Sequence, residues 1–192
     1  LIKREKEVLC YESNVDLKGI NYLTPLFNAI VNERVLKVKY QDFKSLEAYE
    51  ITFHPSYLKQ YNNRWFVLGL NSDNAVPNWN LALDRIVSVQ ENRIAYVASI
   101  IDWDEYFYDL IGVTRPADKP IQEIALLFSQ EVAPYIITKP IHPSQKHQKT
   151  DSGLEVRIKV IPNFELERLI LSFGEQVKVV LPEAFKNIIS ER

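Results

Sequence analysis

Arg64-Trp65-Phe66-Val67-Leu68-Gly69-Leu70 is the stretch of sequence that decides the fold. It is almost continuously apolar, and it is shorter than a helix of ordinary length. Turn residues bound it on both sides, with Asn62-Asn63 before it and Asn71-Ser72-Asp73-Asn74 after it. Such a run predicts a strand that is buried on both faces or that closes a barrel.

The sequence around this strand predicts one helix and four more strands. Apolar residues recur at helical spacing over residues 22–33, with Thr24 as the expected cap and Pro25 at the first helical position. Alternation of apolar and polar residues, or a short apolar run, then indicates each strand. The predicted strands are residues 35–40, 49–53 (ending before Pro55), 79–83 and 86–89. A helix followed by five short strands predicts a small half-open or closed β-barrel.

The rest of the chain has a different order of elements. Residues 101–118 predict a short helix and a linker, and the proline-rich segment 116–120 is the expected domain boundary. The predicted elements beyond it are strand 122–128, a helix capped by Ser129 that ends at 137, strands near 141–148 and at 154–161, a helix from Pro162-Asn163, strand 177–180 and a helix after Pro182. This β-α-β-β-α-β order with a trailing helix predicts a ferredoxin-like sandwich.

Composition limits the class of protein. The chain is 46% hydrophobic and 25% charged, as expected for a soluble globular protein, and no stretch approaches the roughly 18 apolar residues of a membrane span. The single cysteine, Cys10, excludes an internal disulfide and indicates a reducing cytoplasm. A net charge of −2 argues against a protein that coats duplex DNA. The lack of methionine predicts a missing upstream part, to which residues 1–20 would be the leader.

A search for catalytic or metal-binding patterns indicates that the chain is not an enzyme. It has no glycine-rich phosphate-binding loop and no serine nucleophile motif. His142 and His147 lack a cysteine or carboxylate at ligand spacing, so no metal or cofactor is expected. Acidic clusters at residues 102–105 and 165–167 lie at predicted helix starts, where the helix dipole favours them for structural reasons.

One window of sequence is basic and aromatic. Between Glu50 and Asp73 there is no acidic residue. Cations beside aromatic rings suit phosphates and unstacked bases, although Trp65 and Phe66 are expected to belong to the core. The polar candidates, which are costly to bury without partners, are His54, Tyr57, Arg64 and Arg85. Arg85 shares strand parity with Leu81 and Leu83 and would face a groove; pairing with a carboxylate such as Asp84 is the alternative.

Several motifs follow one another in a fixed order along the chain. They are Phe53-His54-Pro55-Ser56-Tyr57-Leu58, Arg64-Trp65-Phe66-Val67-Leu68-Gly69, Leu81-Ala82-Leu83-Asp84-Arg85-Ile86 and Asp104-Glu105-Tyr106-Phe107 followed by Gly112-Val113. Together they resemble the WYL-domain family. The helix at 22–33 and the strand ending at Tyr40 are similar to the family's opening, and residues 119–192 resemble its C-terminal extension. The triplet here is Trp65-Phe66-Val67, so the hydroxyl of the family's middle tyrosine is absent.

The resemblance implies an Sm/SH3-like barrel at residues 21–100 that senses a ligand for a bacterial transcriptional regulator. It further implies an upstream winged helix-turn-helix that binds duplex DNA, a cytoplasmic homodimer, and a nucleotide or single-stranded nucleic acid as ligand. The residues that would line the ligand site are His54, Tyr57, Arg64 and Arg85, together with Tyr40 and Thr52. The alternative is an oligomerisation module with no small ligand, in which the aromatic window is only core and interface.

Overall fold

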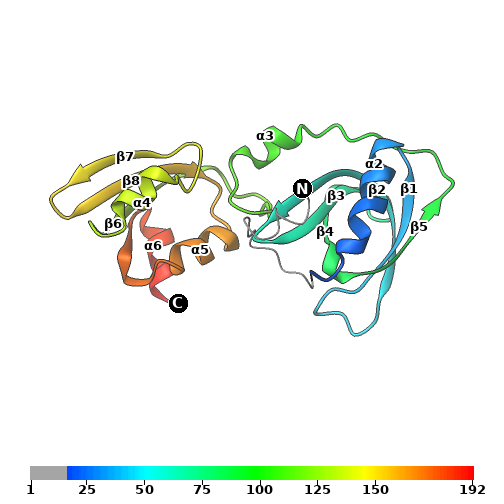
Figure 1. Cartoon of the computed structure of the whole chain (residues 1–192), viewed down its shortest axis with the longest axis horizontal. Coiled ribbons are helices and arrows are strands. Elements are labelled where there is room, and N and C mark those ends of the chain that lie inside the picture. The colour runs from blue at the N-terminus through cyan, green and yellow to red at the C-terminus, as the bar shows by residue number, and fades with distance from the viewer. Residues whose placement is uncertain (1–16) are drawn as a thin grey trace, which may run out of the picture. The chain divides into compact units, whose positions relative to one another are not determined.

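A computed structural model describes residues 17–192, so the predictions for residues 1–16, including Cys10, lie outside the described part of the chain. The chain divides into two compact units, one ending at Ile101 and the other formed by Asp102–Arg192 (Figure 1). The barrel predicted for residues 21–100 lies within the first unit, and the helix predicted after residue 101 groups with the second unit.

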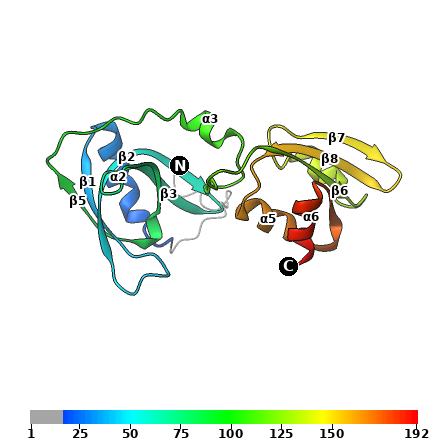
Figure 2. The same ribbon diagram turned by 180° about the vertical axis from the view of Figure 1, so that it is seen from behind.

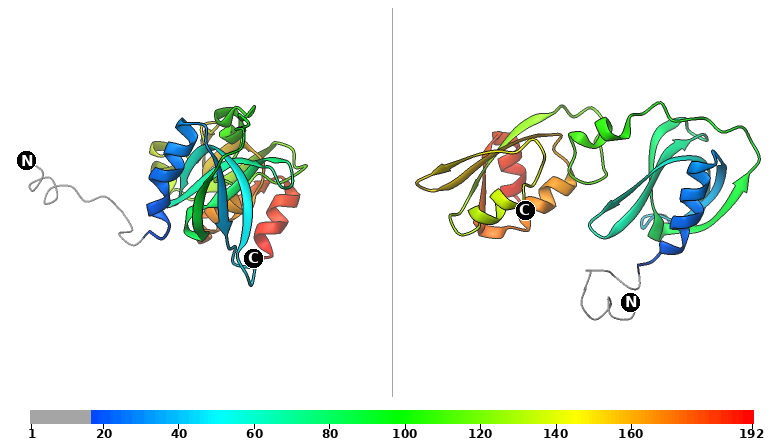
Figure 3. Two further views of the ribbon diagram at one scale, coloured as in Figure 1. Left: turned by 90° about the vertical axis from the view of Figure 1, so that its right-hand side faces the viewer. Right: turned by 45° about the horizontal axis from the view of Figure 1, so that its top comes forward.

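The first unit is an antiparallel sheet of five strands with one helix against it. The sheet order is β4-β3-β2-β1-β5, and helix α2 packs along β2 (Figure 3). Its elements are the 3₁₀ turn η1 (Ile20–Tyr22), α2 (Leu23–Val31), β1 (Val35–Tyr40), β2 (Tyr49–Tyr61), β3 (Arg64–Asn71), β4 (Val76–Ala82), the 3₁₀ turn η2 (Leu83–Arg85) and β5 (Ile86–Asn92). The predicted helix and five strands are therefore confirmed.

Three local predictions in this unit were wrong. Strand β2 does not stop before Pro55 but continues to Tyr61, because a bulge between Pro55 and Tyr57 absorbs the missing backbone donor. Helix α2 has Tyr22, not Thr24, at its N-cap, because η1 leads directly into it. Arg85 lies in η2 and not on a strand, so the parity with Leu81 does not apply to it.

The core of the first unit lies between the sheet and α2. Leu26 and Ala29 of α2 meet buried side chains of all five strands and of η2, which are Leu36, Val38, Tyr40, Ile51, Phe53, Val67, Leu81, Leu83 and Ile86. Trp65 is only partly buried against this cluster, and Phe66 is half-buried outside it. The apolar strand β3 therefore supplies this cluster with Val67, while Leu68, which is also fully buried, lies outside it.

The second unit is a four-stranded antiparallel sheet in the order β7-β8-β6-β9. Its elements are α3 (Trp103–Tyr108), β6 (Gln122–Phe128), α4 (Ala133–Thr138), β7 (Lys146–Thr150), β8 (Gly153–Val160), α5 (Phe164–Leu171), the 3₁₀ turn η3 (Gly174–Gln176), β9 (Val177–Leu181) and α6 (Glu183–Ser190). Helices α5 and α6 lie on the same side of the sheet in two opposite views (Figures 1 and 2). The predicted order of strands and helices, with a trailing helix, is present.

Two elements of the second unit begin later than predicted. Ser129 does not cap a helix; residues 129–132 form a turn in which the Ser129 carbonyl accepts from the amide of Ala133, and α4 starts there. The strand expected near 141–148 begins only at Lys146. The Gln145 side chain accepts from the amide of Ile141 and so holds residues 141–145 in a turn. Pro162-Asn163 does start α5, where the Asn163 side chain accepts from the amide of Leu166.

Candidate functional site

A pocket of about 340 Å³ lies at the end of the first sheet where β1, η2 and β5 meet. Its lining residues come from the segment before η1, the loop after β1, and the turn η2 with the start of β5. They are Lys18, Gln41, Asp42, Phe43, Ser45, Asp84, Arg85, Ile86 and Val87. The pocket thus gathers two cations, two carboxylates and one aromatic ring, a combination that suits a charged ligand of small-molecule size.

Gly19 brings Lys18 to this pocket. Its backbone has a φ of 84°, and a Cβ atom placed on it would lie 2.2 Å from the carbonyl oxygen of Leu83. Only glycine allows so close an approach in this conformation. The segment before α2 therefore packs directly on η2, and Lys18 stands beside Asp84 and Arg85 at the pocket.

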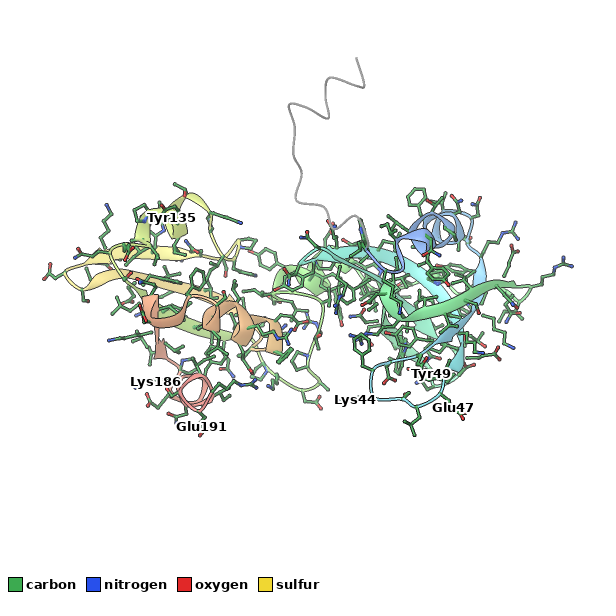
Figure 4. The ribbon with its side chains drawn as sticks, turned by 60° about the horizontal axis from the view of Figure 1, so that its bottom comes forward. Lys44, Glu47, Tyr49, Tyr135, Lys186 and Glu191 are labelled. Atoms are coloured by element: carbon green, nitrogen blue, oxygen red, sulfur yellow. The ribbon has the colours of Figure 1, made fainter. Side chains whose placement is uncertain are left out.

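The loop between β1 and β2 is held in shape by Asp42. Its carboxylate accepts hydrogen bonds from the amides of Lys44 and Ser45, from the Ser45 hydroxyl at 2.8 Å and from the Tyr49 hydroxyl at 3.3 Å. Gln41 donates from its side chain to the Leu46 carbonyl across the same loop. Figure 4 labels Lys44 and Glu47 on this loop and Tyr49 at the start of β2. The hydrogen bond from Ser45, followed by that from the Lys44 amide, lowers the pKa of Asp42, which is ionised at neutral pH.

The loop places Phe43 against Arg85. The guanidinium carbon of Arg85 lies 4.3 Å from the centre of the Phe43 ring, a distance typical of a cation–π contact. Phe43 is 76% exposed, so most of its ring surface is open for stacking. Arg85 makes no ion pair within the described chain, and its Nε is buried without a hydrogen-bond partner there.

Asp84 links the pocket to Arg64. The Arg64 Nε lies 3.5 Å from Oδ2 of Asp84, whereas Oδ1 of Asp84 is buried and has no hydrogen-bond partner among residues 17–192. Arg64 itself does not line the pocket and is about half exposed. Two neighbouring lining residues therefore carry an unused donor, Arg85 Nε, and an unused acceptor, Asp84 Oδ1.

Tyr40 stands behind the pocket, on the side of the core. It is 4% exposed, and its hydroxyl accepts a hydrogen bond from the amide of Ala82. Burial raises the pKa of this hydroxyl, an effect that the Ala82 amide and the charge of Arg85 only partly oppose. Tyr49, which meets Tyr40 edge to face, has its pKa raised to about 12 by burial and by Asp42. Both phenols are therefore neutral at physiological pH.

Three of the predicted site residues lie on β2, outside the lining of this pocket. His54 is 3% exposed, and its Nδ1 accepts a hydrogen bond from the amide of Val97. Burial lowers the pKa of His54, in keeping with a neutral ring that accepts this bond. The amide of Thr52 donates to the carboxylate of Asp73, and Tyr57 is half-buried on the far side of the β2 bulge.

The pocket uses residues that the sequence reasoning passed over. Besides Arg85 and Asp84 it contains Lys18, which had been assigned to the leader, and the loop residues Gln41, Asp42, Phe43 and Ser45. A signal was present in each segment: Lys18 precedes a glycine, and Asp42-Phe43 begins two positions after the last residue of a predicted strand. The geometry can hold an anion against two cations and a flat ring against Phe43.

Two absences can be stated for residues 17–192. No group of three or more histidine, cysteine, aspartate or glutamate side chains is arranged to hold a metal ion. No helix in this range is both long and apolar enough to cross a bilayer.

Comparison with known proteins gave matches at the level of domains and of fold. The family model described as the WYL domain matches residues 21–91, and that described as the WCX domain matches residues 120–192. Proteasome accessory factor B/C (PafBC) of Arthrobacter aurescens is similar at 17% identity and a TM-score of 0.40, over 93% of this chain and 27% of that one. A CRISPR Cas-related protein is similar at 10% identity and a TM-score of 0.54, over 90% and 49%. This chain thus spans half or less of each solved chain, and comparison with curated proteins returned no match.

Proposed function

The chain contains a WYL domain followed by a WCX domain, and from this premise we propose that it is the sensory part of a bacterial transcriptional regulator. Its WYL domain binds a nucleotide or single-stranded nucleic acid and passes the signal to a DNA-binding domain elsewhere in the regulator. The observation that carries the proposal is the pocket formed by Lys18, Phe43 and Arg85. We assign binding, and no catalysis, to this pocket.

The charges of the pocket support an anionic ligand. The Asp42 carboxylate accepts four hydrogen bonds, from the amides of Lys44 and Ser45 and from the hydroxyls of Ser45 and Tyr49. The Asp84 carboxylate forms an ion pair with Arg64, so both carboxylates already have partners within the chain. Lys18 and Arg85 make no ion pair with any residue from 17 to 192. Two cations that converge on one small pocket would hold a phosphate group by charge-assisted hydrogen bonds.

The other polar groups support a nucleotide over a simple anion. A base edge carries both hydrogen-bond donors and acceptors, and the pocket lining offers both kinds of group in the side chains of Asp84 and Arg85. The exposed Phe43 ring offers a stacking surface for the base, worth roughly 1–3 kcal/mol in single-strand binding proteins. The volume, about 340 Å³, lies at the lower end of the range for ligand pockets and suits a single nucleotide unit.

The experiment that tests the proposal is fluorescence anisotropy with a labelled oligothymidylate of about ten residues. We expect Arg85→Gln to weaken binding at least tenfold, because it removes a charged hydrogen-bond donor. Arg168→Gln is the matched control, since Arg168 also lies 4.3 Å from the centre of a phenylalanine ring, Phe164, but does not line this pocket. Equal effects of the two substitutions, or no binding by the wild type, would contradict the proposal.

Salt dependence and ligand length distinguish the two forms of the ligand. Two phosphate contacts predict that affinity for the oligonucleotide falls about sevenfold from 50 to 200 mM salt. If the ligand is a free nucleotide, thymidine monophosphate should compete as well as the oligonucleotide. If it is a single strand, only the longer ligand should compete at comparable concentration.

The same proposal includes the finer architecture and the assembly. We infer an Sm/SH3-like barrel for the first unit, supported by its strand order and by the Tyr40 hydroxyl that meets β4 at Ala82. We infer a ferredoxin-like sandwich for the second, supported by the order β7-β8-β6-β9 with every neighbouring pair antiparallel. A homodimer in the cytoplasm completes the proposed regulator. The alternative function, an oligomerisation module without ligand, predicts that Arg85→Gln changes no binding property.

A further inference from the structure

The second unit contains a groove of its own, about 460 Å³ in volume. It lies between helix α4 and the end of the β7–β8 hairpin, and Figure 1 shows α4 beside these strands. The lining residues are Gln130, Ala133, Pro134, Ile137, Thr138, Lys149, Thr150 and Gly153. Most of the lining is apolar and comes from α4, and Lys149 is the one charged residue in the lining.

The groove follows from a short helix beside an edge strand. Helix α4 has six residues, and every residue of β7 is exposed, so the helix leaves this edge of the sheet uncovered. Gly153 forms part of the lining because its backbone passes close to β6: a Cβ atom there would lie 2.0 Å from the Phe128 carbonyl oxygen. The Gln130 side chain donates to the Asp151 carbonyl at 3.0 Å and so ties the turn before α4 to the hairpin.

The register of the hairpin directs Lys149 toward this groove. Lys149 pairs with Leu154, and Lys146 pairs with Arg157. Directly paired residues on antiparallel strands project from the same face of the sheet. Leu154 is fully buried and Arg157 is exposed, so Lys149 projects from the core face and Lys146 from the outer face. No carboxylate among residues 17–192 forms an ion pair with Lys149.

We propose that this groove binds a small organic anion: an apolar body lies against Ala133, Pro134 and Ile137, and its single acidic group meets Lys149. The volume lies within the range of small-molecule sites, which are mainly apolar with a few polar groups that set orientation. The site is a second effector site, distinct in residues and in ligand chemistry from the nucleotide pocket. An inward-pointing lysine can also serve only to prevent edge-to-edge association of strands, and the experiment separates this role from ligand binding.

The probes are two dyes that differ by one charge. Anilinonaphthalene sulfonate has an apolar body with a sulfonate, and N-phenyl-1-naphthylamine has the same body without it. We expect the full chain to bind the sulfonate more tightly, and Lys149→Gln to raise its Kd about tenfold without changing that of the neutral dye. Lys146→Gln is the matched control, because it removes a lysine from the other face of the same strand.

Two more variants test whether the dyes bind in the groove itself. Thr138→Trp, at an exposed lining position of α4, is expected to fill the groove and to weaken both dyes. Arg85→Gln is expected to leave both Kd values unchanged, so that the two sites are told apart even if the nucleotide proposal fails. Equal effects of Lys149→Gln and Lys146→Gln, equal wild-type affinity for both dyes, or no effect of Thr138→Trp would overturn the proposal. A change in association state alone in Lys149→Gln would overturn it too, and would assign the lysine to edge protection.

Discussion

The pocket of the first unit and the groove of the second unit are built in opposite ways. In the first unit, polar groups converge: a loop held by Asp42, a turn carrying Arg85, and Lys18 brought in by Gly19. In the second, a short helix leaves an apolar strip beside an edge strand, with a single lysine beside it. The first is therefore suited to a ligand recognised by charge and hydrogen bonds. The second is suited to one recognised mainly by apolar contact.

Two arginines sharpen this comparison. Arg85 on Phe43 and Arg168 on Phe164 have the same distance, 4.3 Å, between the guanidinium and the ring centre. Only Arg85 lines the described pocket and has a buried Nε without a partner within residues 17–192. A cation–π contact alone is therefore no sign of a binding site, because long cationic side chains often cover exposed rings. What matters is the convergence of unused polar groups around it.

The largest loss of stability is expected from replacing a glycine of the groove with alanine. Gly153→Ala should lower the free energy of unfolding by about 2–4 kcal/mol, since the backbone has a φ of 144° and the new Cβ meets the Phe128 carbonyl. Gly174→Ala is the matched control: its φ is 56°, but nothing lies within 4 Å of the added atom, so about 1–2 kcal/mol is expected. Urea unfolding measures both.

The corresponding change in the first unit is Gly19→Ala. A Cβ atom there would lie 2.2 Å from the Leu83 carbonyl, and relief of this clash displaces Lys18 from η2. We expect Gly19→Ala to weaken oligonucleotide binding and to leave dye binding unchanged, and Gly153→Ala to do the reverse. Loss of both oligonucleotide binding and dye binding in either variant would show that the pocket and the groove are not independent.

Much of the fold was predictable because the patterns are local. The apolar run at β3, the alternation in β1 and the cap at Asn163 each depend on a few neighbouring residues, and the structure confirms all three elements. The error at Pro55 arose because a bulge can accommodate a proline inside a strand, and a bulge has no reliable local signal. The grouping of residues 102–118 with the second unit had no local signal, because it depends on residues far along the chain, as in the hydrogen bond that the Asn163 side chain donates to the Ile111 carbonyl.

The candidate site was predictable only in part. Arg85 was predicted because an arginine is costly to bury without a partner, and it does line the pocket. Lys18 and Phe43 were missed because exposed loop residues have no period, and their meeting depends on contacts between distant segments. His54 was chosen as a polar group that is costly to bury. The structure shows that its partner is the amide of Val97, 43 residues away. No local sequence pattern predicts a hydrogen bond between residues so far apart.

A smaller effect is expected at the two buried histidines, one in each unit. Nδ1 of His142 accepts from the hydroxyl and the amide of Ser144, and its Nε2 lies 2.8 Å from the Tyr108 carbonyl. Replacing it with phenylalanine should cost about 1–3 kcal/mol, because the carbonyl and the serine lose their partner. His147→Phe is the control, since this histidine is exposed on β7. An equal cost for the two substitutions would contradict a structural role for His142.

These histidines also predict how stability depends on pH. Burial lowers the pKa of both His54 and His142 below the usual 6.5. The unfolded chain therefore takes up protons at higher pH than the folded chain, and stability is lost as the pH falls below about 6.5 toward the folded pKa values. Thermal unfolding should show a Tm that falls over this interval. His54→Asn should flatten the dependence of the first unit, and His142→Asn that of the second. An unchanged slope in both variants would assign the acid sensitivity to other groups.

The smallest effect on binding is expected from Arg64→Gln, and this variant tests the role of Arg64 at the pocket of the first unit. If Arg64 acts only by neutralising Asp84, Arg64→Gln leaves an unpaired carboxylate at a pocket for an anionic ligand. Oligonucleotide affinity should then fall about three- to fivefold, or less than 1 kcal/mol, because the guanidinium of Arg64 is half exposed and solvent screens its charge. Asp84→Asn should then abolish the penalty, so that the double variant binds at least as well as Asp84→Asn alone. If Arg64 instead contacts a phosphate, Arg64→Gln should weaken binding equally in both backgrounds. The measured coupling between the two positions thus separates a residue that tunes the pocket from one that holds the ligand.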